Sequence, residues 1–180
     1  MRQRLLSAEC SGDVSLPTEV ERLMLDVVND GFVVYCCGPK AAPSALVACY
    51  EWKQYVDIVT IRRVDRITTA RVVVPQQGRV DVFAPETVVW AYEGPPQCAL
   101  RALFDLVHPA HPTAPESAYP APPSLRIPRA EQRPMTIRLP APRQTGMRAF
   151  RLAVAMAAGD SRATMTESIV RGVREVTRCR

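Results

Sequence analysis

The apolar positions between residues 32 and 92 fall in short runs rich in β-branched and aromatic residues, and glycine, proline or charged residues separate most of these runs. Runs of this length and composition are typical of β-strands rather than helices. The pattern therefore predicts five or six strands, which cover residues 32–37, 44–52, 79–84, 87–92 and two parts of the stretch 55–74.

A helical period marks the segments on either side of these runs. In residues 18–31 the apolar side chains recur three and four positions apart, and Gly31 is placed to end the helix. The segment 97–108 is apolar around most of its circumference, which predicts a helix packed across the sheet. Two further helices are predicted near the end of the chain, over residues 145–158 and from Thr164 onwards.

The stretch YVDIVTIRRVDRITTARVVV, residues 55–74, predicts a β-hairpin whose turn is formed by residues 63–65. This turn sets Asp57 opposite Arg71, and such an opposite-charge pair contributes about 0.2–1 kcal/mol. The hairpin itself therefore accounts for most charges of the stretch. Binding is a candidate role at the tip, where three arginines gather: Arg62, Arg63 and Arg66.

Proline is concentrated in the second half of the chain, where 12 of the 17 prolines lie between Pro95 and Pro142. An α-helix cannot form across residues 110–143, because each internal proline removes a hydrogen bond and clashes with the preceding turn. We expect this segment to be extended, partly polyproline II, and either wrapped on the domain or free in solvent. Its candidate anchors to the core are Leu125, Ile127, Ile137 and Leu139.

Together these elements predict an α+β fold with a mostly antiparallel sheet of five to six strands, one N-terminal helix and one packed helix, followed by a proline-rich arm and a C-terminal helix. The predicted organisation has four parts. These are a flexible arm (1–15), the α+β domain (16–109), a Pro/Arg-rich extended segment (110–143) and a helical basic tail (144–180).

The net charge of +5 is unevenly distributed along the chain. Residues 1–119 carry 11 basic and 14 acidic side chains, whereas residues 120–180 carry 12 arginines and only four carboxylates. A mildly acidic body with a basic end is typical of chains that bind nucleic acid or another acidic surface. The candidate binding arginines of the extended segment are Arg126, Arg129, Arg133 and Arg138.

The abundance of arginine also fits two interpretations that involve no binding partner. The chain has only two lysines, and GC-rich coding would enrich arginine, alanine, valine and proline without selection for binding. Alternatively, the arginines fasten the extended segment to acidic side chains of the body, of which the candidates are Glu51, Asp57, Asp81, Glu86 and Glu93.

The sequence predicts no catalytic residues, no metal site and no cofactor. His108 and His111 are the only histidines, and no cysteine or carboxylate has the spacing to complete a set of metal ligands with them. The six cysteines form no C-x-x-C pair, and we interpret them as reduced, mostly buried thiols of a cytoplasmic protein. No apolar run reaches the roughly 18 residues that span a bilayer, so no membrane association is expected.

Three segments, GFVVYCCGP, YVDIVTIRRVDRITTARV and VVWAYEGPPQCALRALFDLVHPAHP, resemble small proteins of high-GC actinomycetes such as Streptomyces. The resemblance covers roughly residues 31–158, and it implies no activity and no site residues, because that group has none assigned. The stretch after Ala158 has a different composition and lies outside the resemblance.

The favoured function is that of a cytoplasmic, non-catalytic module that binds an acidic macromolecule, either protein or nucleic acid, through its sheet and arginine-rich arm. One alternative is an enzyme whose chemistry no motif reveals. Another is a structural protein whose apolar C-terminal helix joins subunits. The oligomeric state and the identity of any partner stay open.

Overall fold

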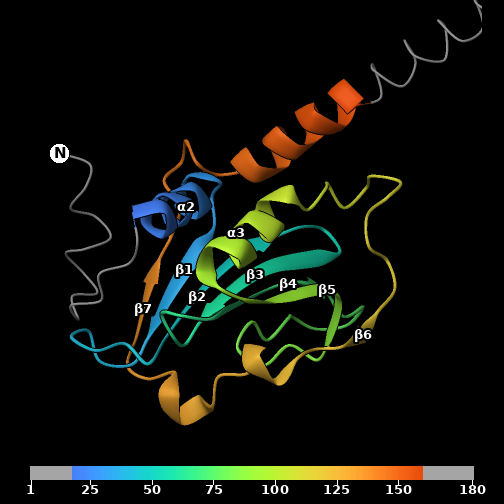
Figure 1. Ribbon diagram of the computed structural model, residues 1–180. Helices are drawn as coiled ribbons and strands as arrows, with labels where there is room; N and C mark the ends of the chain where they lie inside the picture. Colours follow the sequence, from blue (N-terminus) through green and yellow to red (C-terminus); the bar gives the residue numbers. More distant parts are fainter. Residues whose placement is uncertain (1–17, 160–180) are drawn as a thin grey trace, which may run out of the picture.

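The computed structural model describes residues 18–159, which form two long helices, a seven-stranded sheet and a third helix at the C-terminal end (Figure 1). The elements in chain order are α2 (Thr18–Asn29), β1 (Val33–Cys37), β2 (Ala45–Glu51), β3 (Tyr55–Ile61), β4 (Ile67–Val73), β5 (Thr87–Gly94), α3 (Pro96–Asp105), β6 (Tyr119–Pro120), the 3₁₀ turns η1 (Pro123–Leu125) and η2 (Arg129–Glu131), β7 (Met135–Arg138) and a helix over residues 147–159.

Strands β1 to β5 form an antiparallel meander in which each strand pairs with the next along the chain. The β3–β4 hairpin has the predicted register, with Asp57 opposite Arg71 and Val56 opposite Val72. The connection between the two strands is longer than predicted, since it spans residues 62–66. The α+β class and the mostly antiparallel sheet are therefore confirmed.

The strand predicted over residues 79–84 is wrong, because this segment is a loop. The Oδ1 atom of Asp81 accepts a hydrogen bond of 2.9 Å from the backbone N–H of Phe83, which turns the chain within the segment. Its apolar side chains are partly buried because the loop packs on the sheet, not because it belongs to it; these are Val80, Val82 and Phe83.

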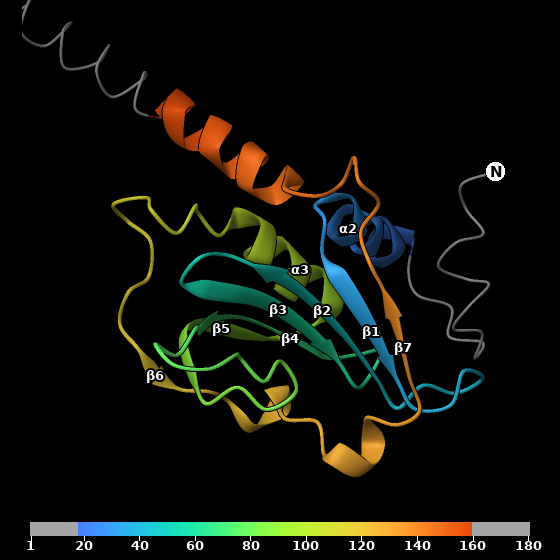
Figure 2. The ribbon, with the colours of Figure 1, turned by 180° about the vertical axis from the view of Figure 1, so that it is seen from behind.

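The proline-rich segment adds one strand to each edge of the meander. Strand β6 pairs with β5, and β7 pairs with β1, which raises the number of strands to seven. Figures 1 and 2 show the segment passing from one edge of the sheet to the other. Between the edges, Leu125 and Ile127 are fully buried, and the N–H of Ile127 donates to the carbonyl of Phe83 at 2.7 Å. The folded unit therefore continues beyond residue 109.

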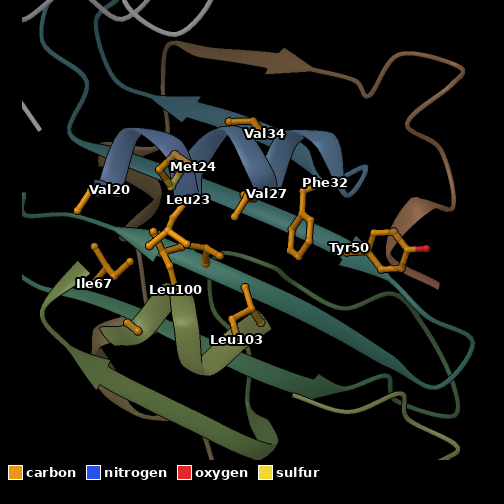
Figure 3. Packing of buried hydrophobic residues seen from close by; sticks show 13 residues of the cluster. Val20, Leu23, Met24, Val27, Phe32, Val34, Tyr50, Ile67, Leu100 and Leu103 are labelled. Carbon is orange, nitrogen blue, oxygen red and sulfur yellow. The ribbon is translucent and has the colours of Figure 1, made fainter. Parts of the chain in front are cut away.

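The sheet has a separate apolar core on each face. Helices α2 and α3 cover one face, where Val20, Leu23 and Val27 of α2 point toward Leu100 and Leu103 of α3 (Figure 3). On the other face, the loop after β4 and the segment that contains η1 pack against the alternate side chains of the strands. The central strands β2, β3 and β4 are therefore buried on both sides along most of their length.

The helix over residues 147–159 confirms the predicted helix and points away from the sheet (Figure 1). Arg148 and Leu152 are buried against the body, whereas Met147, Phe150 and Val154 are exposed. The predicted arm over residues 1–15 and the helix predicted from Thr164 lie outside the described residues.

Gly31 allows the chain before the last helix to approach the end of α2. Its φ is +94°, and a Cβ atom at this position would lie 2.2 Å from the carbonyl oxygen of Gln144. Gly31→Ala is expected to lower the free energy of unfolding by about 3 kcal/mol, because it adds a backbone clash to an unfavourable φ. Urea denaturation measures the change.

Gly78→Ala is the matched control. Gly78 also has a positive φ, of +100°, but a Cβ atom there would meet nothing within 4 Å. This substitution is expected to cost only the backbone penalty of about 1–2 kcal/mol. Equal losses of stability in the two variants would contradict the close approach of the chain at Gln144.

Candidate binding surface

A buried carboxylate, that of Asp57 on β3, joins the sheet to the C-terminal helix. Arg71 of β4 donates to it from Nε at 2.7 Å and from Nη2 at 3.0 Å. The Nε atom of Arg148 and the indole N–H of Trp52 both donate to its Oδ2 atom, each at 2.9 Å. The side chains of Asp57, Arg71 and Arg148 are at most 1% exposed. The predicted Asp57–Arg71 pair is therefore present, but it is buried and shared with a third residue.

A second carboxylate, that of Asp30 at the end of α2, extends the cluster. Arg151 donates to it at 2.6 and 3.1 Å, and Arg148 makes a longer contact of 3.4 Å. Arg148 also donates to the carbonyl of Leu103 near the end of α3, at 3.0 Å. Two arginines of the predicted basic tail, the buried Arg148 and the partly exposed Arg151, therefore fasten the last helix to α2, α3 and the sheet.

The environment of Asp57 keeps its carboxylate charged. Burial by itself would raise the pKa of this carboxyl group. The hydrogen bonds from Arg71, the charges of Arg148 and Arg71, and the hydrogen bond from Trp52 outweigh burial and lower the pKa of Asp57. The carboxylate thus acts as a permanent negative centre that balances the buried guanidinium groups.

The three arginines at the tip of the β3–β4 hairpin surround a hollow of about 330 Å³. The hollow lies on the sheet face opposite α2 and α3. The residues of β3 and β4 that line it alternate along each strand with the residues whose side chains pack against these helices. Its lining consists of Arg62, Arg63, Arg66, Ser44, Thr60, Thr68, Glu93 and Ser124.

Each of these three arginines also contacts a carboxylate. Arg62 lies 2.7 Å from Glu131 of η2, and Arg66 lies 2.7 Å from Glu93 of β5. Arg63 pairs with its neighbour Asp65 at 2.9 Å. The structure therefore brings the three predicted binding residues of the hairpin tip together, and their role in binding stays a prediction.

The predicted binding arginines of the arm lie elsewhere. Arg126, Arg129 and Arg133 are exposed and make no ion pair within residues 18–159, and Arg138 lies half-buried on β7. None of the four lines the hollow. The seven arginines predicted to bind thus fall into two groups, one at the hairpin tip and one along the arm.

Sequence reasoning missed an apolar row on the arm. Ile137 and Leu139, two predicted core anchors, are 51% and 73% exposed, and Met135 is 40% exposed. They remain outside the core because β7 forms the edge of the sheet and no described segment covers this end of its second face. The sequence does carry a sign of this row, because apolar and polar residues alternate in MTIRL, residues 135–139, between two prolines. Such a pattern is typical of an edge strand.

Two of the described cysteines, Cys37 and Cys49, are buried thiols. Burial raises the pKa of the Cys49 thiol to about 11 and also raises that of Cys37, so both stay protonated at neutral pH. His108 and His111 each accept a hydrogen bond from a backbone N–H two residues further on. Residues 18–159 contain no group of three or more potential metal ligands.

Within the same residues, no helix combines the length and the apolar character that crossing a bilayer requires. Comparison with known proteins gives no match to this chain among family models, curated proteins or solved structures. The candidate function therefore rests on the geometry of the described residues.

Asp57→Asn is expected to lower the free energy of unfolding by about 3–5 kcal/mol, because it leaves the buried charge of Arg71 without a counterion and that of Arg148 with only the 3.4 Å contact to Asp30. Urea denaturation followed by Trp fluorescence measures this loss. Asp65→Asn removes the carboxylate of an exposed pair and is expected to leave the stability unchanged. A stable Asp57→Asn protein would contradict the central role of the carboxylate.

Proposed function

We propose that this protein is a cytoplasmic, non-catalytic module that binds an extended, acidic segment of a protein partner along strand β7. The observation that carries the proposal is a sheet edge with an exposed apolar row, formed by Met135, Ile137 and Leu139. The free, buried thiols of Cys37 and Cys49 suit the reducing cytoplasm.

The backbone of β7 is oriented to accept another strand. The N–H of Gly38 donates to the carbonyl of Pro134 at 2.8 Å, so the hydrogen-bonded pairs of the β1–β7 ladder continue at Thr136 and Arg138. The backbone groups of Met135 and Ile137 then face away from β1. No described strand pairs with this outer side, and an extended peptide can add there by main-chain hydrogen bonds.

The side chains around β7 favour a protein over a nucleic acid. In the register of the β1–β7 pair, Ile137 lies opposite Tyr35, so the exposed row continues the apolar face of the sheet. Apolar side chains of a peptide strand would cover this row, whereas a phosphate backbone would not. The exposed Arg129 and Arg133 near the start of β7 favour acidic residues in the partner.

A selection from a random peptide library on the immobilised protein tests this proposal. We expect enriched peptides with alternating apolar residues and with Asp or Glu at their ends, and changes in the NMR shifts of the Met135 and Ile137 amides. Ile137→Lys is expected to weaken peptide binding by about tenfold or more, because it places a strongly hydrated charge in the apolar row.

Leu25→Lys is the matched control, since Leu25 is also exposed but lies on α2. It is expected to leave peptide binding unchanged. The proposal fails if no peptide binds the wild-type protein, or if oligonucleotides bind and Ile137→Lys does not affect the complex.

Self-assembly through the last helix is a second candidate function. Phe150 is 65% exposed and Val154 is 53% exposed, and both lie on the side of the helix that faces away from the body. Residues 152–159 carry no charge, so two such helices could pack together without burying a charged group.

If this helix joins subunits, light scattering should give a mass above the 19.9 kDa of one chain. Phe150→Glu should then return the mass to that of one chain without lowering the stability, because the side chain is exposed. A wild-type protein with the mass of one chain at high concentration would exclude self-assembly.

A further inference from the structure

The arginine-lined hollow at the tip of the β3–β4 hairpin has the composition of a binding site for a small polar molecule. All eight lining residues carry a guanidinium, hydroxyl or carboxylate group, and they come from β3, β4, β5, the hairpin connection, the turn before β2 and the 3₁₀ turn η1. The volume of about 330 Å³ lies in the range of small-molecule pockets. A lining of this kind favours a ligand that is charged or rich in hydroxyl groups.

Thr60 provides a second, independent sign of a ligand. Its side chain lines the hollow and is 2% exposed, yet its hydroxyl group has no hydrogen-bond partner among the described residues. A buried hydroxyl without a partner is costly, so such groups are nearly always satisfied in folded proteins. An oxygen atom of a ligand in the hollow would supply the missing partner.

The arginines keep donors for an anion. Arg62 uses Nη2 in its contact with Glu131, and Arg66 uses Nε in its contact with Glu93, whereas a guanidinium group has five N–H donors. Both pairs lie at the surface, where ion pairs are weak. Donors of Arg62 and Arg66 that these contacts leave unused are therefore available to an anion in the hollow.

Glu93 defines the other part of the ligand. Its carboxylate accepts a hydrogen bond of 2.8 Å from Ser124 and contacts Arg66 at 2.7 Å, so it is held in place at the edge of the hollow. A carboxylate repels an anion and accepts hydrogen bonds from hydroxyl groups. We infer that the hollow binds a small phosphorylated polyol or sugar, with its phosphate at Arg62, Arg66 and Thr60 and its hydroxyl groups at Glu93.

Calorimetric titration of the full-length protein at constant ionic strength tests this inference. The probes are glycerol 3-phosphate, inorganic phosphate and glycerol. We expect saturable binding of glycerol 3-phosphate, weaker binding of inorganic phosphate, and none of glycerol. Equal binding of the two phosphates would contradict the role of Glu93, and the absence of saturable binding would overturn the site.

Variants separate the site from general attraction to a basic surface. Arg66→Gln is expected to weaken binding of glycerol 3-phosphate by about tenfold or more, since it removes a charge-assisted hydrogen bond. Thr60→Val keeps the shape of the side chain, and we expect it to weaken binding while the urea midpoint stays the same or rises. Arg129→Gln, which alters an exposed arginine outside the hollow, is expected to have no effect.

Equal losses in Arg66→Gln and Arg129→Gln would overturn the inference in favour of unspecific attraction. Tight binding of a phosphoserine peptide, with none of glycerol 3-phosphate, would also overturn it, in favour of a macromolecular ligand. The inference is independent of the peptide site on β7, because Arg66→Gln and Thr60→Val should still bind the peptides selected on the wild-type protein.

Discussion

The carboxylate of Asp57 is the interaction on which the rest of the structure depends. It lies on a central strand and neutralises guanidinium groups from the neighbouring strand and from a helix 91 residues away in sequence, Arg71 and Arg148. Burying one of these charges alone would cost several kcal/mol. Arg71 and Arg148 also donate to backbone carbonyls after and within α3, those of Val107 and Leu103. The cluster therefore fixes where the chain passes after it leaves α3 and where the last helix docks.

The proline-rich segment runs between the end of α3 and the last helix, and it adds a strand to each edge of the sheet. Its prolines exclude an α-helix and favour an extended course, and its few large apolar residues decide where it touches the body. Leu125 and Ile127 complete the core on the second face, and short strands on either side of them cover both edges of the meander. Because the segment pairs with both edges of the sheet, its exposed side chains have a defined place relative to the sheet.

The arginines of the cluster, the hairpin tip and the arm, all within residues 18–159, differ in their chemistry. Arg71, Arg148 and Arg151 lie within the buried or partly buried cluster and serve the fold. Those of the hairpin tip surround a polar hollow, and those of the arm lie near an apolar sheet edge. A positive net charge alone does not separate these groups. Their surroundings do: the interior arginines pair with buried carboxylates, those at the hollow pair with surface carboxylates beside hydroxyl groups, and those of the arm lie near apolar side chains of β7.

The sequence by itself determined most of the local elements, because their signs depend on residues close in the chain. These signs are the spacing of apolar residues, the glycines and prolines between the runs, and the charge pair across the β3–β4 hairpin. It misplaced residues 79–84, where alternating apolar side chains reflect a loop packed on the sheet. Only the tertiary structure decided that Asp57 also meets Arg148, that Thr60 and Ser124 line one hollow, and that Ile137 stays exposed while Ile127 is buried. The physical reason is that the burial of a side chain and its ion pairs depend on which distant segments come into contact. The pattern of apolar residues within one segment does not indicate which other segment it contacts.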